Sequence, residues 1–116
     1  MKESEAIESL AALAQPSRLA VFRLLVQRGP EGYVVGDLGG RLGIPGPTLS
    51  FHLKALTRAG LISARKEGRF LYYSADFAQM NALVAFLTEH CCSLSTQCAP
   101  DTCAPIRQPS IRKRSA

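Results

Sequence analysis

Four cysteines, the only ones in this chain of 116 residues, lie within thirteen residues near its C-terminal end. Cys91 and Cys92 are adjacent, and a five-residue loop separates them from Cys98. Adjacent side chains at a helix end point in different directions, but this loop is long enough to swing Cys98 back toward the pair. Thiolates bind soft, thiophilic ions, whereas Mg²⁺ and Ca²⁺ take oxygen ligands. Three sulfur atoms could therefore face one thiophilic ion.

The number of thiolates separates the candidate ions. As(III) or Sb(III) takes three thiolates in a pyramid and forms a neutral complex, whereas Zn²⁺ or Cd²⁺ takes four ligands. Three closely spaced cysteines with a more distant Cys103 favour As(III) or Sb(III) as the bound ion. A zinc site that merely ties down the tail, with Cys103 or His90 as its fourth ligand, is less favoured, because the tail offers no core to fix.

Redox chemistry is the alternative interpretation of these thiols. A disulfide from Cys91 or Cys92 to Cys98 or Cys103 would make the protein a redox or persulfide sensor. A catalytic Cys–His pair is disfavoured, because His90 precedes Cys91 directly and adjacent helical residues diverge by about 100°. The chain also lacks a G-x-S-x-G motif, a P-loop and a dinucleotide fingerprint. We therefore expect no enzymatic activity.

The cysteines follow a segment that is predicted to be a helix, 77–90, capped by Asp76 or Ser74. Its apolar residues recur three or four positions apart, as in a helix with one buried face: Met80, Leu83, Val84, Phe86 and Leu87. An apolar helix at the end of so small a domain needs a partner. A second copy of the chain would supply one.

Two helices are predicted at the start of the chain. Glu5 and Glu8 lie among the apolar residues of a short first helix, where acids near the N-terminus suit the helix dipole. Pro16 begins a second helix, and Gly29–Pro30 ends it. Their apolar residues are predicted to form the core: Ile7, Leu10, Ala11, Leu13, Leu19, Val21, Phe22, Leu24, Leu25 and Val26.

A further helix is predicted between Pro47, at its first position, and Gly60, just past its end. Leu49, Leu53 and Leu56 form one apolar stripe at helical spacing. The opposite face carries a mixture of small polar, aromatic and basic side chains: Thr48, Ser50, Phe51, Lys54, Ala55 and Arg58. A shorter helix in the segment VVGDLGGRLGI precedes it, and Gly43 marks the turn between the two.

A β-hairpin is predicted next, with strands 61–66 and 69–74 joined by Glu67–Gly68. From 45 to 74, five basic residues stand against the single acid Glu67, and the whole chain carries a net charge of +5. This clustering favours a polyanionic partner. Two helices, a turn and a basic hairpin predict a mainly α fold with a β-hairpin wing, the winged helix-turn-helix.

The segment GDLGGRLGIPGPTLSFHLKALTRAGLISARKEGRFLYY resembles the ArsR/SmtB family of metalloregulatory repressors, and the resemblance extends from about Leu10 to about Cys98. Both cysteines of the family's E-L-C-V-x-D-L-C pattern are absent from 32–39, and of the zinc-sensing ligands on the last helix only Asp76 matches. The C-C-x5-C spacing of Cys91, Cys92 and Cys98 resembles a separate arsenic-site variant of the family. The resemblance implies a homodimer through the first and last helices and a palindromic double-stranded operator, released when As(III) or Sb(III) binds.

For DNA contacts, we expect Thr48, Ser50 and Phe51 to approach base edges and the basic residues to contact phosphate. His52 lies at the edge of the leucine stripe, where a hydrogen-bonded, partly buried role or a phosphate contact is expected. The predicted DNA-binding set is Thr48, Ser50, Phe51, His52, Lys54, Arg58, Arg65 and Arg69. Gly46 stands where the family often has a polar reader such as Gln.

The chain is predicted to form one domain over 1–92, followed by a flexible cysteine-containing tail over 93–116 that is rich in Pro, Ser, Thr and Arg from Ala99 onward. The N-terminal segment shows neither the pattern of a signal peptide nor that of a membrane span. A cytoplasmic location without membrane contact is therefore expected. In a reducing cytosol, the cysteines are expected to be thiols or ligands.

Overall fold

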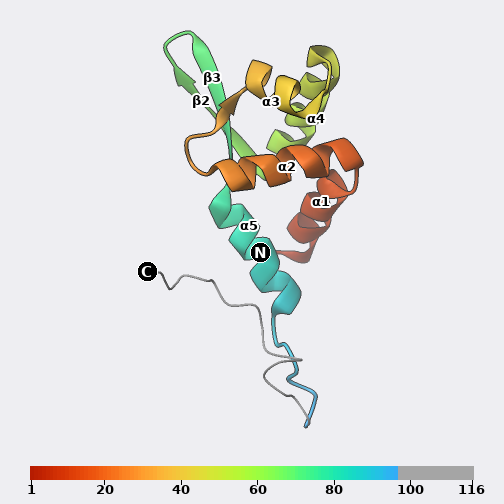
Figure 1. Cartoon of the computed structure of the whole chain (residues 1–116). Helices are drawn as coiled ribbons and strands as arrows, with labels where there is room; N and C mark the ends of the chain where they lie inside the picture. Colours follow the sequence, from red (N-terminus) through yellow and green to blue (C-terminus); the bar gives the residue numbers. More distant parts are fainter. Residues whose placement is uncertain (97–116) are drawn as a thin grey trace.

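The computed structural model describes residues 1–96, so Cys98, Cys103 and the tail from Ala99 lie outside the described residues. Figure 1 shows five helices and a small antiparallel sheet. In chain order these are α1 (Glu3–Leu13), α2 (Pro16–Arg28), β1 (Tyr33–Val34), α3 (Val35–Leu42), α4 (Gly46–Arg58), β2 (Ile62–Glu67), β3 (Phe70–Ala75) and α5 (Phe77–Thr88). The predicted mainly α fold with a hairpin wing is confirmed.

The core lies where α2, α3 and α4 meet the base of the hairpin. The predicted leucine stripe of α4 is confirmed, since Leu49, Leu53 and Leu56 are at most 2% exposed. Each such buried leucine contributes on the order of 1.5–3 kcal/mol of transfer free energy. The side chains that pack around the stripe come from every neighbouring element: Val21, Phe22, Leu25, Leu38, Leu61, Ile62 and Ala75.

The helix-turn-helix unit is α3 and α4. Gly43 ends α3 in the left-handed conformation, with φ +66°, as predicted. The α4 helix begins at Gly46, so Pro47 is its second residue rather than its first. At the other end, Gly60 has φ +80°, and the amides of Gly60 and Leu61 donate to the carbonyls of Thr57 and Leu56. These bonds satisfy carbonyls in the last turn of α4.

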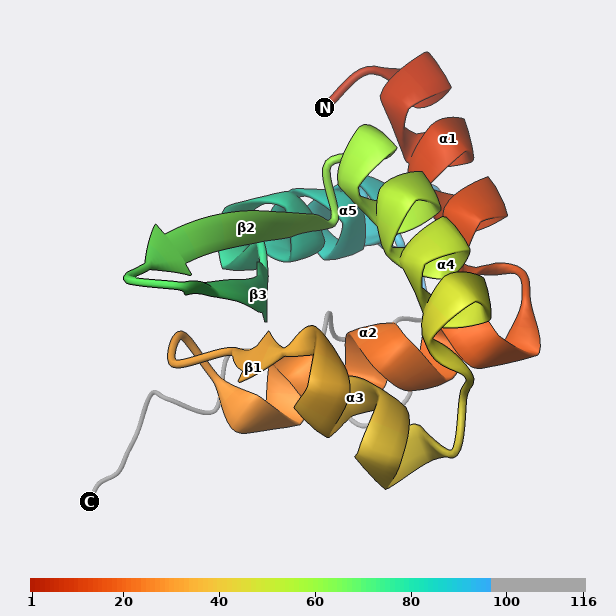
Figure 2. The same ribbon diagram turned by 90° about the horizontal axis from the view of Figure 1, so that it is seen from above.

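The wing is a three-stranded sheet in the order β1-β3-β2, and Figure 2 shows it beside α3. Glu67 pairs with Phe70, so the tip residues are 68–69 and not the predicted Glu67–Gly68. The third strand, β1, was not predicted, because two residues are too short to show a strand period. Gly32 precedes it with φ +73°, and a Cβ there would collide with the carbonyl oxygen of Tyr73.

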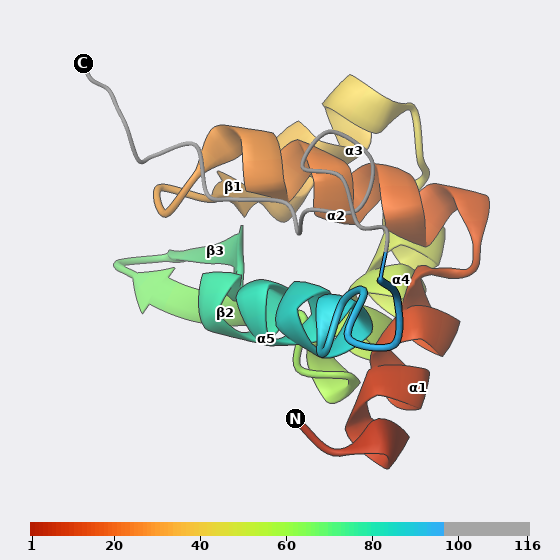
Figure 3. The same ribbon diagram turned by 90° about the horizontal axis from the view of Figure 1, so that it is seen from below.

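Figure 1 shows α1 and α5 below α2, away from the tip of the wing, and Figure 3 shows both helices from below. The buried face of α1 consists of Ala6, Ser9 and Ala12, whereas Ile7 and Leu10, predicted as core, are 58% and 42% exposed. On α5 only Leu83 is buried, and Val84 and Leu87 are exposed. Both terminal helices therefore present apolar side chains that the core does not cover.

The last helix is shorter than predicted. Asp76 caps its N-terminus by accepting from the amide of Gln79, as expected. It ends at Thr88 rather than at His90, because Glu89 turns to an extended ψ of 132° and His90 takes φ +59°. In residues 1–96, no single helix is long and apolar enough to cross a membrane; α1 and α2 reach that length only as a pair bent by 103°.

Candidate DNA-binding surface and cysteine site

The exposed face of α4 carries most of the predicted DNA-contacting residues. Phe51 is 63% exposed although it is a large aromatic side chain, and Thr48, Ser50, Lys54 and Arg58 are exposed around it. Since Leu49, Leu53 and Leu56 hold the opposite face of α4 in the core, the face that carries these side chains is turned to the surface. The structure thus brings five of the eight predicted residues together on one helix face.

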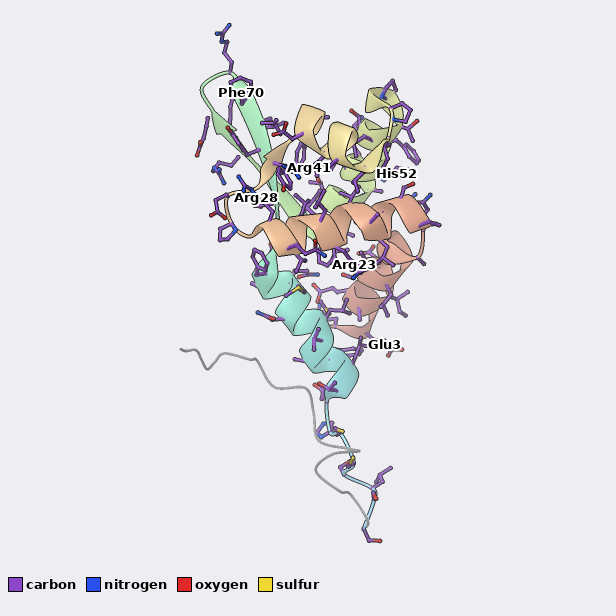
Figure 4. The ribbon with its side chains drawn as sticks, viewed as in Figure 1. Glu3, Arg23, Arg28, Arg41, His52 and Phe70 are labelled. Atoms are coloured by element: carbon purple, nitrogen blue, oxygen red, sulfur yellow. The ribbon has the colours of Figure 1, made fainter. Side chains whose placement is uncertain are left out.

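His52 does not belong to that surface. It is only 6% exposed, and its Nδ1 accepts a hydrogen bond from Nε of Arg18 at 3.3 Å. Figure 4 shows His52 where α4 meets the start of α2. This buried, hydrogen-bonded position fits the first of the two roles predicted for His52, and a DNA contact by His52 does not fit this conformation. The contact with Arg18 was not predicted, because the two residues lie 34 positions apart in the sequence.

Arg65 is also engaged within the chain. Its Nε donates to Oε2 of Glu67 at 2.7 Å, and its Nη1 and Nη2 donate to the carbonyls of Pro30 and Glu31 at 3.2 and 3.1 Å. Its guanidinium also lies 5.2 Å from the ring centroid of Tyr72. Arg65 therefore ties the wing to the α2–β1 loop, and its prediction as a phosphate contact does not fit this conformation. Arg69 stays exposed at the wing tip, as predicted.

A cluster of two arginines around Tyr33 was not predicted from the sequence. The guanidinium groups of Arg28 and Arg41 each lie 4.9 Å from the ring centroid of Tyr33. Figure 4 labels Arg28 at the end of α2 and Arg41 below α3. Nε of Arg28 also donates to the carbonyl of Gly32 at 3.1 Å. Arginine stacking on an aromatic ring contributes about 0.5–1 kcal/mol at exposed sites, so this cluster fixes β1 between α2 and α3.

The two described cysteines do not point apart. Their Sγ atoms lie 3.5 Å from each other on the turns that follow α5, so the prediction of diverging side chains is wrong. The reason is the backbone: Cys92 takes φ +63°, outside the helix on which the prediction was based. Desolvation, followed by the hydrogen bond and charge of Cys91, raises the pKa of the Cys92 thiol. Neither residue forms a disulfide within the described part of the chain.

The third predicted thiol cannot be placed. Cys98 and Cys103 lie outside the described residues. Within residues 1–96, no three His, Cys, Asp or Glu side chains come together as a metal site. The described structure therefore shows the sulfur atoms of Cys91 and Cys92 side by side, and the ligand roles of Cys91, Cys92 and Cys98 stay predictions.

These features define a winged helix-turn-helix domain with an exposed, basic recognition helix. The sequence of residues 13–64 matches the family model of the helix-turn-helix domain. The nodulation protein NolR of Rhizobium meliloti is 33% identical over 104 residues, which cover 90% of this chain and 77% of NolR. The arsenical resistance operon repressor of Bacillus subtilis is 32% identical over 96 residues, which cover 83% of this chain and 88% of the repressor.

Among solved structures, the homodimeric winged helix-turn-helix domain of Mb0332 from Mycobacterium bovis, a possible ArsR-family regulator, superposes with a TM-score of 0.59. It is 32% identical and covers 75% of this chain, with 81% of its own length matched. The chain belongs to the ArsR family of transcriptional regulators. Regulators of this kind are not enzymes, which supports the expectation that this chain has no catalytic activity.

Proposed function

We propose that this protein is an arsenite- or antimonite-responsive repressor that binds a palindromic operator as a homodimer and releases it when As(III) binds Cys91, Cys92 and Cys98. The observation that supports this most directly is the 3.5 Å between the Sγ atoms of Cys91 and Cys92. Two thiolates on one ion, each bonded at about 2.3 Å, lie roughly 3.3–3.8 Å apart. The observed separation of 3.5 Å falls within this range, which supports a shared ion.

A disulfide between these two cysteines fits less well. Their α-carbons are joined by a trans peptide, which sets them about 3.8 Å apart, whereas disulfides usually join α-carbons about 4.4–6.8 Å apart. A redox sensor would therefore need Cys98 or Cys103 as the partner of one of them. This persulfide- or redox-sensing repressor is the alternative function for the same thiols, and a Zn²⁺- or Cd²⁺-responsive repressor with four ligands is another.

The dimer proposal rests on the terminal helices. Ile7 and Leu10 on α1, and Val84 and Leu87 on α5, are exposed apolar side chains on helices that lie on the same side of the molecule. Pairing of these faces across a twofold axis would bury them and place two recognition helices about one DNA turn apart. The relatives include a homodimer and an arsenical resistance repressor. A regulator of this kind works on DNA in the cytoplasm.

Ion binding would act on DNA affinity through α5. Bound As(III) supplies three bonds to sulfur, which hold three cysteines around one point. Cys91 lies three residues after the last residue of α5, Thr88, so an ion shared with Cys98 would constrain the end of the helix that we assign to the dimer interface. A small shift there changes the separation of the two α4 helices. A coupling of about 1–3 kcal/mol changes operator affinity by roughly 5–150-fold.

Stoichiometry tests the ligand assignment without DNA. The purified full-length protein, kept in excess reductant, is dialysed against arsenite, and arsenic and zinc are counted per protomer by elemental analysis. One arsenic per protomer in the wild type, lost in Cys98→Ser, is expected. Zinc that copurifies in stoichiometric amounts and that arsenite does not displace contradicts the arsenite proposal. Thiol titration before and after mild oxidation detects the disulfide of the redox alternative.

A further inference from the structure

Arg18 joins the scaffold helix α2 to the recognition helix. Its Nε donates to Nδ1 of His52 at 3.3 Å, and its guanidinium carbon lies 5.8 Å from the ring centroid of Phe51. Both partners belong to α4, one buried and one exposed. The Arg18 head group is therefore held at the edge of the α4 face that we assign to DNA, although α2 lies outside the helix-turn-helix unit.

A groove opens at this junction. It has a volume of about 420 Å³ and is lined by Arg18, Phe51, Lys54, Ala55 and Arg58. Three of these five residues are cations, and none is an acid. In residues 1–96 the only salt bridge joins Arg65 to Glu67, so no carboxylate is paired with the cations of the groove. Glu8 lines a neighbouring, smaller hollow that shares Arg18, Ala55 and Arg58.

Such a groove is suited to a phosphate. Three cations gathered without a counterion repel one another, and an anion between them removes that repulsion. The Arg18 guanidinium uses Nε for His52, and within the described residues its two terminal amino groups have no protein acceptor. A guanidinium presents paired donors that match phosphate oxygens. The fifth lining residue is the small Ala55, which leaves room for the ligand.

We propose that Arg18, with Lys54 and Arg58, binds a backbone phosphate of DNA, which makes α2 part of the DNA-binding surface. The inference rests on the DNA binding proposed for α4, because the same groove borders Phe51 on the exposed face of that helix. The DNA backbone is the occupant, since it carries one negative charge per about 1.7 Å of helix axis and borders any groove into which α4 is inserted.

Salt dependence tests this contact. Binding of the full-length protein to a labelled DNA duplex of arbitrary sequence is measured by fluorescence anisotropy at several salt concentrations, because a phosphate contact does not depend on sequence. Arg18→Gln is expected to reduce the slope of log K against log salt by about 0.9 for each bound protomer. Arg18→Lys keeps the charge and is expected to keep most of the slope.

Arg23→Gln is the matched control. Arg23 lies on the same helix, five residues further along, and Figure 4 places it on the side of α2 toward α1. Arg23→Gln removes the same charge as Arg18→Gln and is expected to leave the slope of log K against log salt unchanged. Thermal unfolding of each variant checks that the fold is intact.

Two results overturn the inference. One is a salt slope in Arg18→Gln that equals the wild-type slope. The other is an Arg18→Lys variant that loses as much slope as Arg18→Gln, because this would show that Arg18 only positions His52. If the wild type binds no duplex at all, both the proposed DNA-binding function and the Arg18 contact are wrong. Wild-type binding with a normal salt slope, combined with an unchanged Arg18→Gln slope, removes the Arg18 contact alone.

Discussion

The Nε2 of Gln79 on α5 donates to Oγ of Ser9 on α1 at 3.3 Å, across seventy positions of sequence. Ser9 is fully buried, and the same Gln79 amide lies 3.7 Å from the position of a Cβ on Gly60, where α4 ends. One side chain near the start of α5 thus contacts α1 and reaches the end of the recognition helix. We expect a movement of α5 to be transmitted through Gln79 to α1, which we assign to dimerisation, and to the end of α4, which we assign to DNA binding.

Loss of this hydrogen bond should weaken both the fold and the coupling. Ser9→Ala is expected to lower the free energy of unfolding by about 1 kcal/mol, because the hydrogen bond from Gln79 is lost and alanine adds no new polar group. Urea unfolding measures the change. We also expect arsenite to release DNA less effectively from Ser9→Ala, with the arsenic stoichiometry unchanged. An unaltered arsenite effect would show that the coupling follows another route.

Gly32 should tolerate no side chain. Gly32→Ala is expected to destabilise the fold by about 1–3 kcal/mol, because φ is +73° and the new Cβ meets the carbonyl of Tyr73. Gly36→Ala is the matched control: Gly36 lies in α3 with nothing within 4 Å of its Cβ position, so alanine should be neutral or stabilise by up to about 1 kcal/mol. Equal urea-unfolding midpoints for Gly32→Ala and Gly36→Ala would contradict the backbone strain expected at Gly32.

The main helices, the turn and the hairpin could be predicted from the sequence, whereas the exceptions have two causes: the packing of distant segments and a local backbone angle. The leucine stripe of α4, Gly43 and Gly60 are local signals, because helix period and glycine φ depend on neighbouring residues. The partners of Arg65, 34 and 35 positions away, and the two-residue strand β1 depend on how distant segments pack. The approach of the Cys91 and Cys92 sulfur atoms depends on one backbone angle that no spacing reveals.

The pH dependence of binding should separate arsenite from zinc. As(OH)₃ and three thiols form the tris-thiolate and three waters with no net proton release, whereas Zn²⁺ displaces thiol protons. The raised pKa of Cys92 keeps this thiol protonated at neutral pH, so its proton is lost only as the pH rises. From about pH 6 to about pH 8, below the usual thiol pKa, arsenite affinity should stay nearly constant and zinc affinity should increase. Titrations in buffers of differing pH measure both; a steep rise for arsenite contradicts the neutral complex.

The three-ligand assignment makes Cys103 dispensable. Cys91→Ser and Cys92→Ser are expected to abolish the response to arsenite and to spare DNA binding, because serine oxygen is a poor ligand for soft ions. Cys103→Ser should behave as the wild type in the same assay. A Cys103→Ser variant that loses the response as completely as Cys92→Ser would require a fourth ligand and would favour zinc.

The most direct test of the inducible repressor is operator binding with arsenite titrated, in excess reductant, against the wild type and Cys98→Ser. Fluorescence anisotropy of labelled operator DNA reports the bound fraction. The account predicts that arsenite releases DNA from the wild type and leaves the Cys98→Ser complex intact. Wild-type binding that arsenite does not change contradicts the proposed inducer and assigns the cysteines to redox chemistry or to zinc.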